Sequence, residues 1–203
     1  MVPTQIERFF RTLAQECDEP ATVILTGAAA GSLWGHIRPS VDIDFAIRPS
    51  RRSRRRWAAI EEAIERTVRR TGISANYAED IDRWSSVSLL DYQRHARPYR
   101  RFGTLRVRVL DPAYWSIGKM SRYLDPDVRD VVAVFRRHPV ALPRLLRLWA
   151  RAARASPRSL AVTQFCRQAE HFLRTDGRAI WGRAFDAERA IARFRIHLAA
   201  RNV

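Results

Sequence analysis

Apolar positions recur with two different spacings along the chain, and this difference predicts an α/β protein. Apolar residues three and four positions apart predict helices over 3–17 and 51–70. β-Branched or alternating runs predict strands at 22–26, 41–47 and 105–110. We therefore expect a small mixed β-sheet flanked by helices.

Up to residue 138 further patterns predict a strand at 73–77, a short strand at 87–90, a basic loop at 94–101 and helices that begin at Pro112 and Pro126. From residue 139 onward no alternating pattern typical of a strand occurs. The later patterns predict helices over 143–155, from 157 to a break at Gly177, and over 185–200. The chain therefore divides into an α/β domain over 1–138 and an all-α C-terminal region over 139–203.

The most distinctive pattern lies in residues 22–47. The apolar strand at 22–26 is followed by a turn at Gly27 and by a helix of small residues over 28–34. Small side chains let a helix pack closely on the strand that precedes it. The chain is expected to be organised around this strand, turn and helix.

The strand that follows carries two acids. Asp42 and Asp44 alternate with Val41, Ile43 and Phe45. Because side chains repeat every two residues on a strand, the two carboxylates should share one face, with Cα atoms about 7 Å apart. The three apolar residues should face the core.

Two neighbouring carboxylates on an otherwise apolar strand are costly. Two like charges about 4 Å apart repel by roughly 4 kcal/mol at an effective dielectric of 20. A divalent cation would convert that repulsion into a binding site, and Mg²⁺ favours one or two carboxylates together with phosphate oxygens. The alternative is that both acids lie in water at a strand end and pair with arginines.

This segment resembles the polymerase-β-like nucleotidyltransferase superfamily. Gly27, Asp42 and Asp44 match its signature, whereas Ala28 stands where glycine or serine is usual. The resemblance implies transfer of an NMP from an NTP, with Mg²⁺ or Mn²⁺ on the two aspartates and phosphate at the amides of Gly27 and Ala28. Many members carry a third acid on the next strand, where this chain has Asn76.

Two further residues lie between the small-residue helix and the acids. Arg38 could clamp a phosphate just before the acidic strand. His36 is within reach of the same site, although a histidine at this place more often simply caps the helix that it follows. Both are therefore candidate nucleotide-binding residues.

Lys119 is the only lysine among 37 basic side chains of lysine and arginine. A compact ammonium serves as a point-charge ligand for phosphate, whereas arginine is a wide fork. Lys119 followed by Asp127 and Asp130 resembles an element of the AbiEii/MenT-like nucleotidyltransferases of toxin–antitoxin and abortive-infection systems. The resemblance implies that Lys119 contacts nucleotide phosphate and that Asp130, or less directly Asp127, activates the acceptor hydroxyl. The alternatives are a surface lysine and two acids that favour the dipole of their helix.

The charge balance points to a polyanionic partner. The formal net charge is +16 and the pI is about 11.4, which suits nucleic acid; the alternative for the preference for arginine over lysine is the codon bias of a GC-rich genome. We expect tRNA as the acceptor, with a protein or a small molecule as alternatives, and the family resemblance implies a toxin with a separate antitoxin. A different hypothesis is a non-catalytic nucleic-acid-binding protein on a degenerate transferase scaffold.

Basic residues also gather in two places along the chain. One is the cluster at 51–56, which is either a solvated helix face or a rim that binds RNA or nucleotide phosphate. The other is the strand at 105–110, where Arg106 and Arg108 should share one face.

The remaining composition predicts a cytoplasmic protein without a membrane partner. Cys17 and Cys166 show no metal-binding spacing and are expected to be reduced thiols. No secretory signal pattern and no apolar run of transmembrane length is evident.

Overall fold

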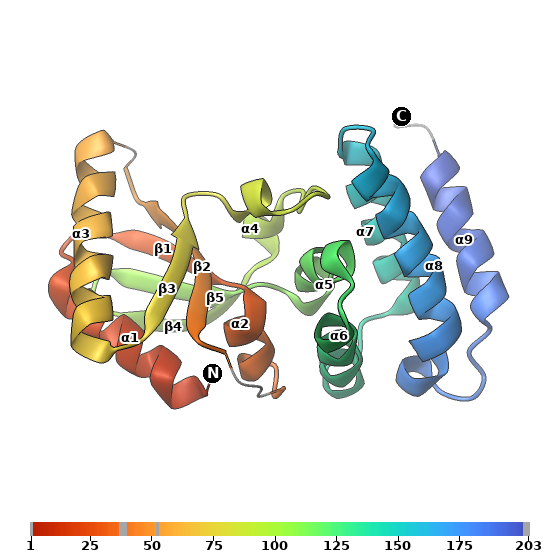
Figure 1. The fold of residues 1–203 in the computed structure, drawn as a ribbon, viewed down its shortest axis with the longest axis horizontal. Coiled ribbons are helices and arrows are strands. Elements are labelled where there is room, and N and C mark those ends of the chain that lie inside the picture. Colours follow the sequence, from red (N-terminus) through yellow and green to blue (C-terminus); the bar gives the residue numbers. More distant parts are fainter. Residues whose placement is uncertain (1, 37–39, 52, 201–203) are drawn as a thin grey trace. The chain divides into compact units, whose positions relative to one another are not determined.

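The computed structural model of the protein describes residues 2–36, 40–51 and 53–200 (Figure 1). These residues form two compact units. The sheet unit comprises residues 1–81 and 93–111, and the helical unit comprises residues 82–92 and 112–203. The division falls at residue 111 instead of the expected 138, because α5 (Pro112–Arg122) and α6 (Asp125–Arg137) pack against α8 (Leu160–Trp181).

The sheet unit holds a five-stranded mixed sheet in the order β3-β2-β1-β5-β4. Its strands are β1 (Ala21–Leu25), β2 (Asp42–Pro49), β3 (Ser74–Ala78), β4 (Arg97–Phe102) and β5 (Leu105–Val109). β1 runs antiparallel to β2 and parallel to β5, whereas β2 and β3 are parallel and β4 and β5 are antiparallel. The predicted fold class, a mixed sheet with flanking helices, is confirmed.

One face of the sheet is covered by α1 (Pro3–Glu16) and α3 (Arg54–Thr71), which lie beside each other in Figure 1. The ring of Phe10 on α1 lies 5.4 Å from that of Phe45 on β2 and 6.4 Å from that of Phe102 on β4. These aromatic rings are fully or almost fully buried, and they mark the helix-covered face. The short helix α2 (Gly27–Leu33) connects β1 to the segment before β2.

Three expectations about individual residues or segments were wrong. Val41 was expected in the core, but β2 begins at Asp42 and the Val41 side chain is 86% exposed. Residues 94–101 were expected to be a loop, yet residues 97–102 form β4, because their backbone pairs with β5. Residues 87–90 form turns instead of a strand, although Val87 is buried.

The helical unit contains α5, α6 and α8 together with α7 (Leu142–Ala155) and α9 (Ala187–Ala199). α4 (Tyr92–His95) and a single 3-10 turn (Ile81–Trp84) connect the units. Gly177 was expected to break α8, but the helix continues through it to Trp181. The ring of Phe185 lies against Gly177 and leaves no room for a Cβ atom, so glycine is required there by packing and not by a turn.

Two smaller observations concern the expected location of the protein. Within the described ranges, no helix is both long and apolar enough to span a bilayer. Cys17 and Cys166 are free, and burial raises the pKa of both thiols.

Candidate active site

Gly27 makes the closest approach in the predicted site. It begins α2 with a positive φ of 57°, a conformation that glycine adopts without strain. A Cβ atom added there would lie 1.9 Å from Oδ2 of Asp44. The neighbouring amide of Thr26 donates to the backbone oxygen of Asp44 at 3.0 Å. Only glycine can therefore occupy this position while the Asp44 carboxylate lies against the start of α2.

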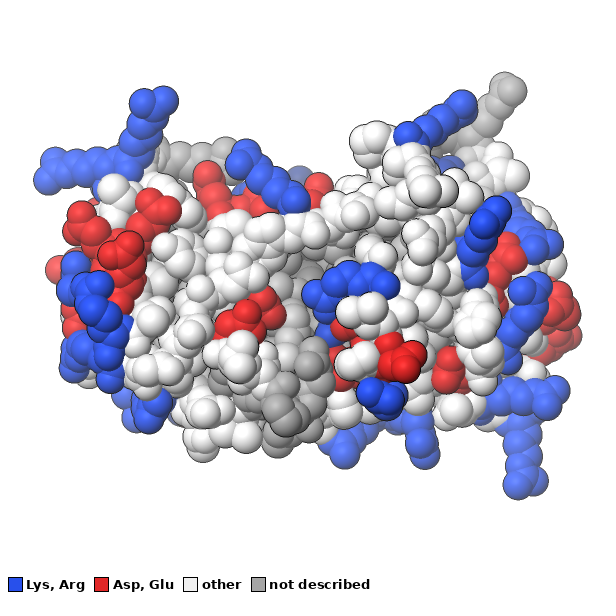
Figure 2. Space-filling model, in the orientation of Figure 1, with Lys and Arg blue, Asp and Glu red and all other residues white. Residues whose placement is uncertain are grey.

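The two aspartates share one sheet face, as their alternation predicts. Asp42 and Asp44 are partly exposed, whereas Ile43 and Phe45 between and beside them are fully buried. The hydroxyl of Ser40 donates to Oδ1 of Asp42 at 3.1 Å. On the face shown in Figure 2, a small acidic patch lies over the region of α2 and β2, and uncharged atoms surround it.

Asn76 lies beside Asp44 on the adjacent strand. The two residues are partners in the β2–β3 register, and Nδ2 of Asn76 donates to Oδ1 of Asp44 at 3.0 Å. The amide therefore orients the carboxylate at the place where the family resemblance leads one to expect a third acid. The sequence shows Asn76 on a strand, but only the register brings it to Asp44.

The carboxylates fit a magnesium ion by their chemistry. No group of three or more His, Cys, Asp or Glu residues arranged to hold a metal occurs in the part of the chain that the structure describes. Magnesium does not need one, since it commonly takes one or two carboxylates and completes its shell with water and substrate phosphate. Asp42 and Asp44 offer that pair of hard oxygen ligands on one partly exposed face.

The structure shows less of a role in the site for Ala28 and His36, two other predicted nucleotide-binding residues. Ala28 is 5% exposed, so its side chain belongs to the packing of α2. The backbone amide of His36 donates to the oxygen of Gly31 at 2.9 Å, which places His36 at the end of α2. Arg38 lies outside the described residues.

Lys119 forms a buried ion cluster with both of its predicted aspartates. Its Nζ lies 2.9 Å from Oδ1 of Asp127 and 2.6 Å from Oδ2 of Asp130. The three side chains are only 2–4% exposed. Arg122, whose side chain is 58% exposed, donates to the carboxylate of Asp127 from the outer side at 2.8 and 3.1 Å.

The cluster is closed and balanced. An ammonium has three donors; in Lys119 two serve carboxylates, and Nζ also lies 5.3 Å from the centre of the Trp115 ring. Burial favours the protonated form of Asp127, but hydrogen bonds from Arg122 and Lys119 outweigh it and lower its pKa below the usual value. This arrangement supports a structural role, in which the cluster fixes α5 against α6.

The predicted site residues thus form two groups. Gly27, Asp42 and Asp44 belong to the sheet unit, whereas Lys119, Asp127 and Asp130 belong to the helical unit. Each group is assembled within its own unit by the contacts described above.

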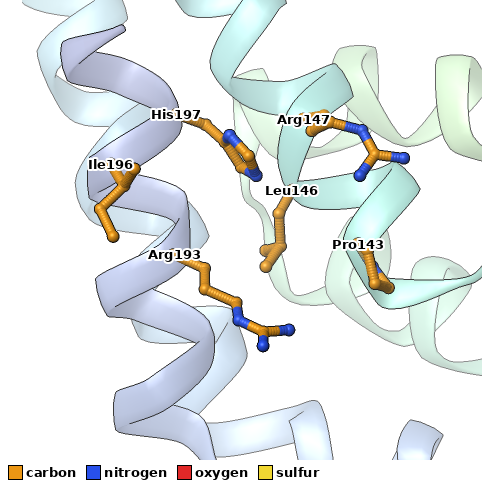
Figure 3. Close-up of a pocket in the computed structure, with 6 residues that line it drawn as sticks. All are labelled: Pro143, Leu146, Arg147, Arg193, Ile196 and His197. Atoms are coloured by element: carbon orange, nitrogen blue, oxygen red, sulfur yellow. The ribbon is translucent and has the colours of Figure 1, made fainter.

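A separate pocket of about 260 Å³ lies in the helical unit between α7 and α9 (Figure 3). It is lined by Pro143, Leu146, Arg147, Arg193, Ile196 and His197. None of these residues carries a carboxylate, a thiol or a hydroxyl. The pocket therefore adds no further acid or metal-binding oxygen to the candidate chemistry.

Comparisons with known proteins found no relative. No protein-family model matches the chain, and neither the curated proteins nor the solved structures contain a significant match. The functional argument therefore depends on the residues of the site and on the motif resemblance.

Proposed function

We propose that the protein is a metal-dependent nucleotidyltransferase that moves an NMP from an NTP to an acceptor. The observation that carries this proposal is the approach of Gly27 to the Asp44 carboxylate, with Asp42 on the same sheet face. It reproduces in three dimensions the strand, glycine turn, helix and Asp-x-Asp strand on which the family resemblance depends.

The chain's own residues suggest how the site would be organised. Asp42 and Asp44 would hold Mg²⁺ or Mn²⁺. Bound there, the ion would offset the negative charge of the triphosphate. The amide of Asn76 keeps one oxygen of Asp44 oriented, and its other oxygen lies on the side of Gly27. The missing side chain at Gly27 makes room for the Asp44 carboxylate at the start of α2, where the metal and the triphosphate would meet.

The acceptor is proposed to be RNA, with tRNA as the leading candidate. A net charge of +16 supports an anionic macromolecule over a neutral small molecule or protein acceptor. The resemblance to toxin-type transferases adds that the protein would arrest growth and would be neutralised by an antitoxin. Expression of the wild type should then slow growth, and Asp44→Asn should abolish that effect.

One observation favours a second candidate function, a nucleic-acid-binding protein without catalysis. Asn76 occupies the place next to Asp44 where a third carboxylate would complete the metal site. This function predicts RNA binding that is unaffected by changes to either aspartate.

A transfer assay separates the two candidates. Purified protein is incubated with Mg²⁺ or Mn²⁺, each α-³²P-labelled NTP in turn and total tRNA. Wild type is compared with Asp42→Asn/Asp44→Asn and with the control Glu62→Gln, whose exposed side chain lies on α3 of the same unit. Label on RNA with wild type and the control, but not with the double variant, supports the transferase.

The same proteins provide a readout that does not depend on activity. Binding of Mn²⁺, followed by the loss of its free-ion EPR signal, should weaken at least tenfold in Asp42→Asn/Asp44→Asn. Equal Mn²⁺ binding by all three proteins, together with no label from any NTP, would refute the transferase and leave the binding protein.

A further inference from the structure

A row of three arginines and one threonine crosses the sheet face opposite the buried aromatic side chains. The strand registers place Arg101 of β4 opposite Arg106 of β5, Arg106 beside Thr22 of β1, and Thr22 opposite Arg48 of β2. These four residues form the arginine row. Because Phe102 and Leu105 point to the helix-covered face, the residues next to them in sequence point away from it.

The β4–β5 end of this row carries two uncompensated like charges. Arg101 and Arg106 are both exposed, and neither forms an ion pair with a carboxylate among the described residues. Nε of Arg101 donates only to the backbone oxygen of Gly103, at 2.9 Å. Like charges directly opposite each other in an antiparallel pair destabilise a sheet, so this pair has a local cost.

Other arginines nearby are paired, which makes the exception informative. Arg100, the neighbour of Arg101 on the same strand, lies 2.7 Å from Glu7 of α1. Arg48, at the β2 end of the row, lies 3.0 Å from Asp80. Two neighbouring arginines of the sheet therefore reach a carboxylate, whereas Arg101 and Arg106 reach none among the described residues.

Further exposed arginines follow the last residue of β2, at the strand end where β5 begins. Pro49, the last residue of β2, pairs with Ala21, which pairs with Leu105 at the start of β5. Within six residues after Pro49 the chain carries the exposed side chains of Arg51, Arg54 and Arg55, of which the last two begin α3 and so belong to the helix-covered side. Asp44 and Arg48 are four residues apart on β2, a separation of about 13 Å between their Cα atoms. Acidic and basic residues thus occupy opposite ends of this strand.

We propose that Arg101 and Arg106 bind the phosphate backbone of a polynucleotide without reading its sequence. Guanidinium groups bind phosphate with two parallel hydrogen bonds, and a phosphate between Arg101 and Arg106 would convert their repulsion into binding. The proposal needs neither Asp42 nor Asp44, and it therefore stands apart from nucleotidyl transfer.

An anionic membrane is a weaker fit for the same charges. Membrane-surface segments combine basic residues with apolar side chains that enter the lipid. The large exposed apolar residues in the described ranges are Val2, Val41, Trp84, Leu124, Leu160 and Ile196. None of them lies on β4, on β5 or in the segment 51–56.

The test measures how the binding of a fluorescein-labelled 20-nucleotide polyuridine depends on KCl concentration. Anisotropy titrations compare wild type with Arg101→Gln/Arg106→Gln, and the matched control is Arg100→Gln, which removes a neighbouring charge that is already paired. Two lost phosphate contacts should reduce the slope of log K against log salt by about 1.4. Affinity in 0.1 M KCl should fall about tenfold, whereas the control should change it less than twofold.

Three outcomes would overturn the proposal. One is unchanged binding by Arg101→Gln/Arg106→Gln, and another is an equal loss in the control variant. The third is binding to vesicles of phosphatidylglycerol and phosphatidylcholine with no binding to RNA or to a 20-base-pair DNA duplex. A urea titration should show that the double variant is at least as stable as wild type, so that weaker binding does not reflect misfolding.

The experiment also keeps this proposal distinct from the transferase. RNA binding that depends on Arg101 and Arg106 but persists in Asp42→Asn/Asp44→Asn supports the surface whether or not any NTP is used. Transfer activity that survives Arg101→Gln/Arg106→Gln, with RNA binding unchanged, would retain the enzyme and reject the surface.

Discussion

Replacing Lys119 with methionine should be among the most damaging single changes to the helical unit. The ammonium is the cation shared by two carboxylates, and all three groups are buried. Lys119→Met keeps the apolar stem and much of the volume but leaves Asp130 and the inner side of Asp127 without that cation. The structure therefore predicts a loss of stability and not only a loss of activity.

The size of the effect follows from the burial of the cluster. Breaking a buried ion pair by removing one partner typically costs about 3–5 kcal/mol, because the remaining charge stays desolvated. Arg122→Gln is the matched control, since its side chain is 58% exposed and Asp127 keeps its contact with Lys119. An exposed partner of this kind contributes about 0–1 kcal/mol.

Hydrogen exchange of peptides from α5 and α6 is the appropriate assay, because it reports the local free energy of opening. Tryptophans occur in both compact units, so fluorescence would mix the unfolding of one with that of the other. Lys119→Met should speed exchange in α5 and α6 by about two to four orders of magnitude, as a loss of about 3–5 kcal/mol requires. Arg122→Gln should change it by less than about tenfold.

A rescue variant separates structure from catalysis at this cluster. Lys119→Met/Asp127→Leu/Asp130→Leu replaces all three buried charges with apolar groups, an exchange that is often neutral or stabilising. Recovered protection with recovered transfer would assign the cluster a purely structural role. Recovered protection with transfer still absent would support a catalytic role for the cluster, through the predicted contact of Lys119 with phosphate or through acceptor activation by Asp130. Exchange in Lys119→Met within twofold of wild type would refute the reasoning.

The pH dependence has a definite sign. The pKa of Asp127 is lower in the folded protein than in the unfolded chain, because hydrogen bonds from Arg122 and Lys119 outweigh its burial. Its contribution is therefore complete above about pH 4 and is lost as the pH falls through the lowered value. Wild type should lose protection of α6 on acidification, and Lys119→Met should lose less because part of the contribution is already absent.

Three further substitutions test other parts of the structure. Asn76→Asp would place a carboxylate beside Asp44, so the free energy of unfolding without divalent cations should fall. Mg²⁺ should then raise the melting temperature of this variant more than that of wild type. Equal shifts in melting temperature would count against a metal at this position. Gly177→Ala would place Cβ 2.1 Å from a ring atom of Phe185 and should cost about 1–3 kcal/mol in urea unfolding. Gly118→Ala meets nothing within 4 Å in the same unit and should stabilise by about 0.4–1 kcal/mol, so a loss in both glycine variants would contradict the packing argument.

Local patterns in the sequence predicted much of the sheet unit. Alternation along β2 placed Asp42 and Asp44 on one face because the pleat of a strand fixes side-chain direction whatever the neighbours are. The strand, glycine and small-residue sequence around Gly27 likewise predicted β1 and α2. In these cases the backbone geometry of a single element decides the outcome.

Features that depend on contact with another part of the chain could not be predicted from local sequence patterns. β4 was missed because most of its residues are exposed and polar, and it becomes a strand only by pairing with β5. Gly177 looked like a helix end, because its need for a small residue comes from Phe185 on a later segment.

The candidate site shows the same division. The sequence by itself determined that Asp42 and Asp44 point the same way and that Gly27 begins the next helix, since these depend on residues close together in the chain. Only the tertiary structure placed Asn76 against Asp44 and buried Lys119 between two aspartates of another helix. A charged side chain carries no local signal of its burial, because burial depends on the packing of elements that the chain brings together only on folding.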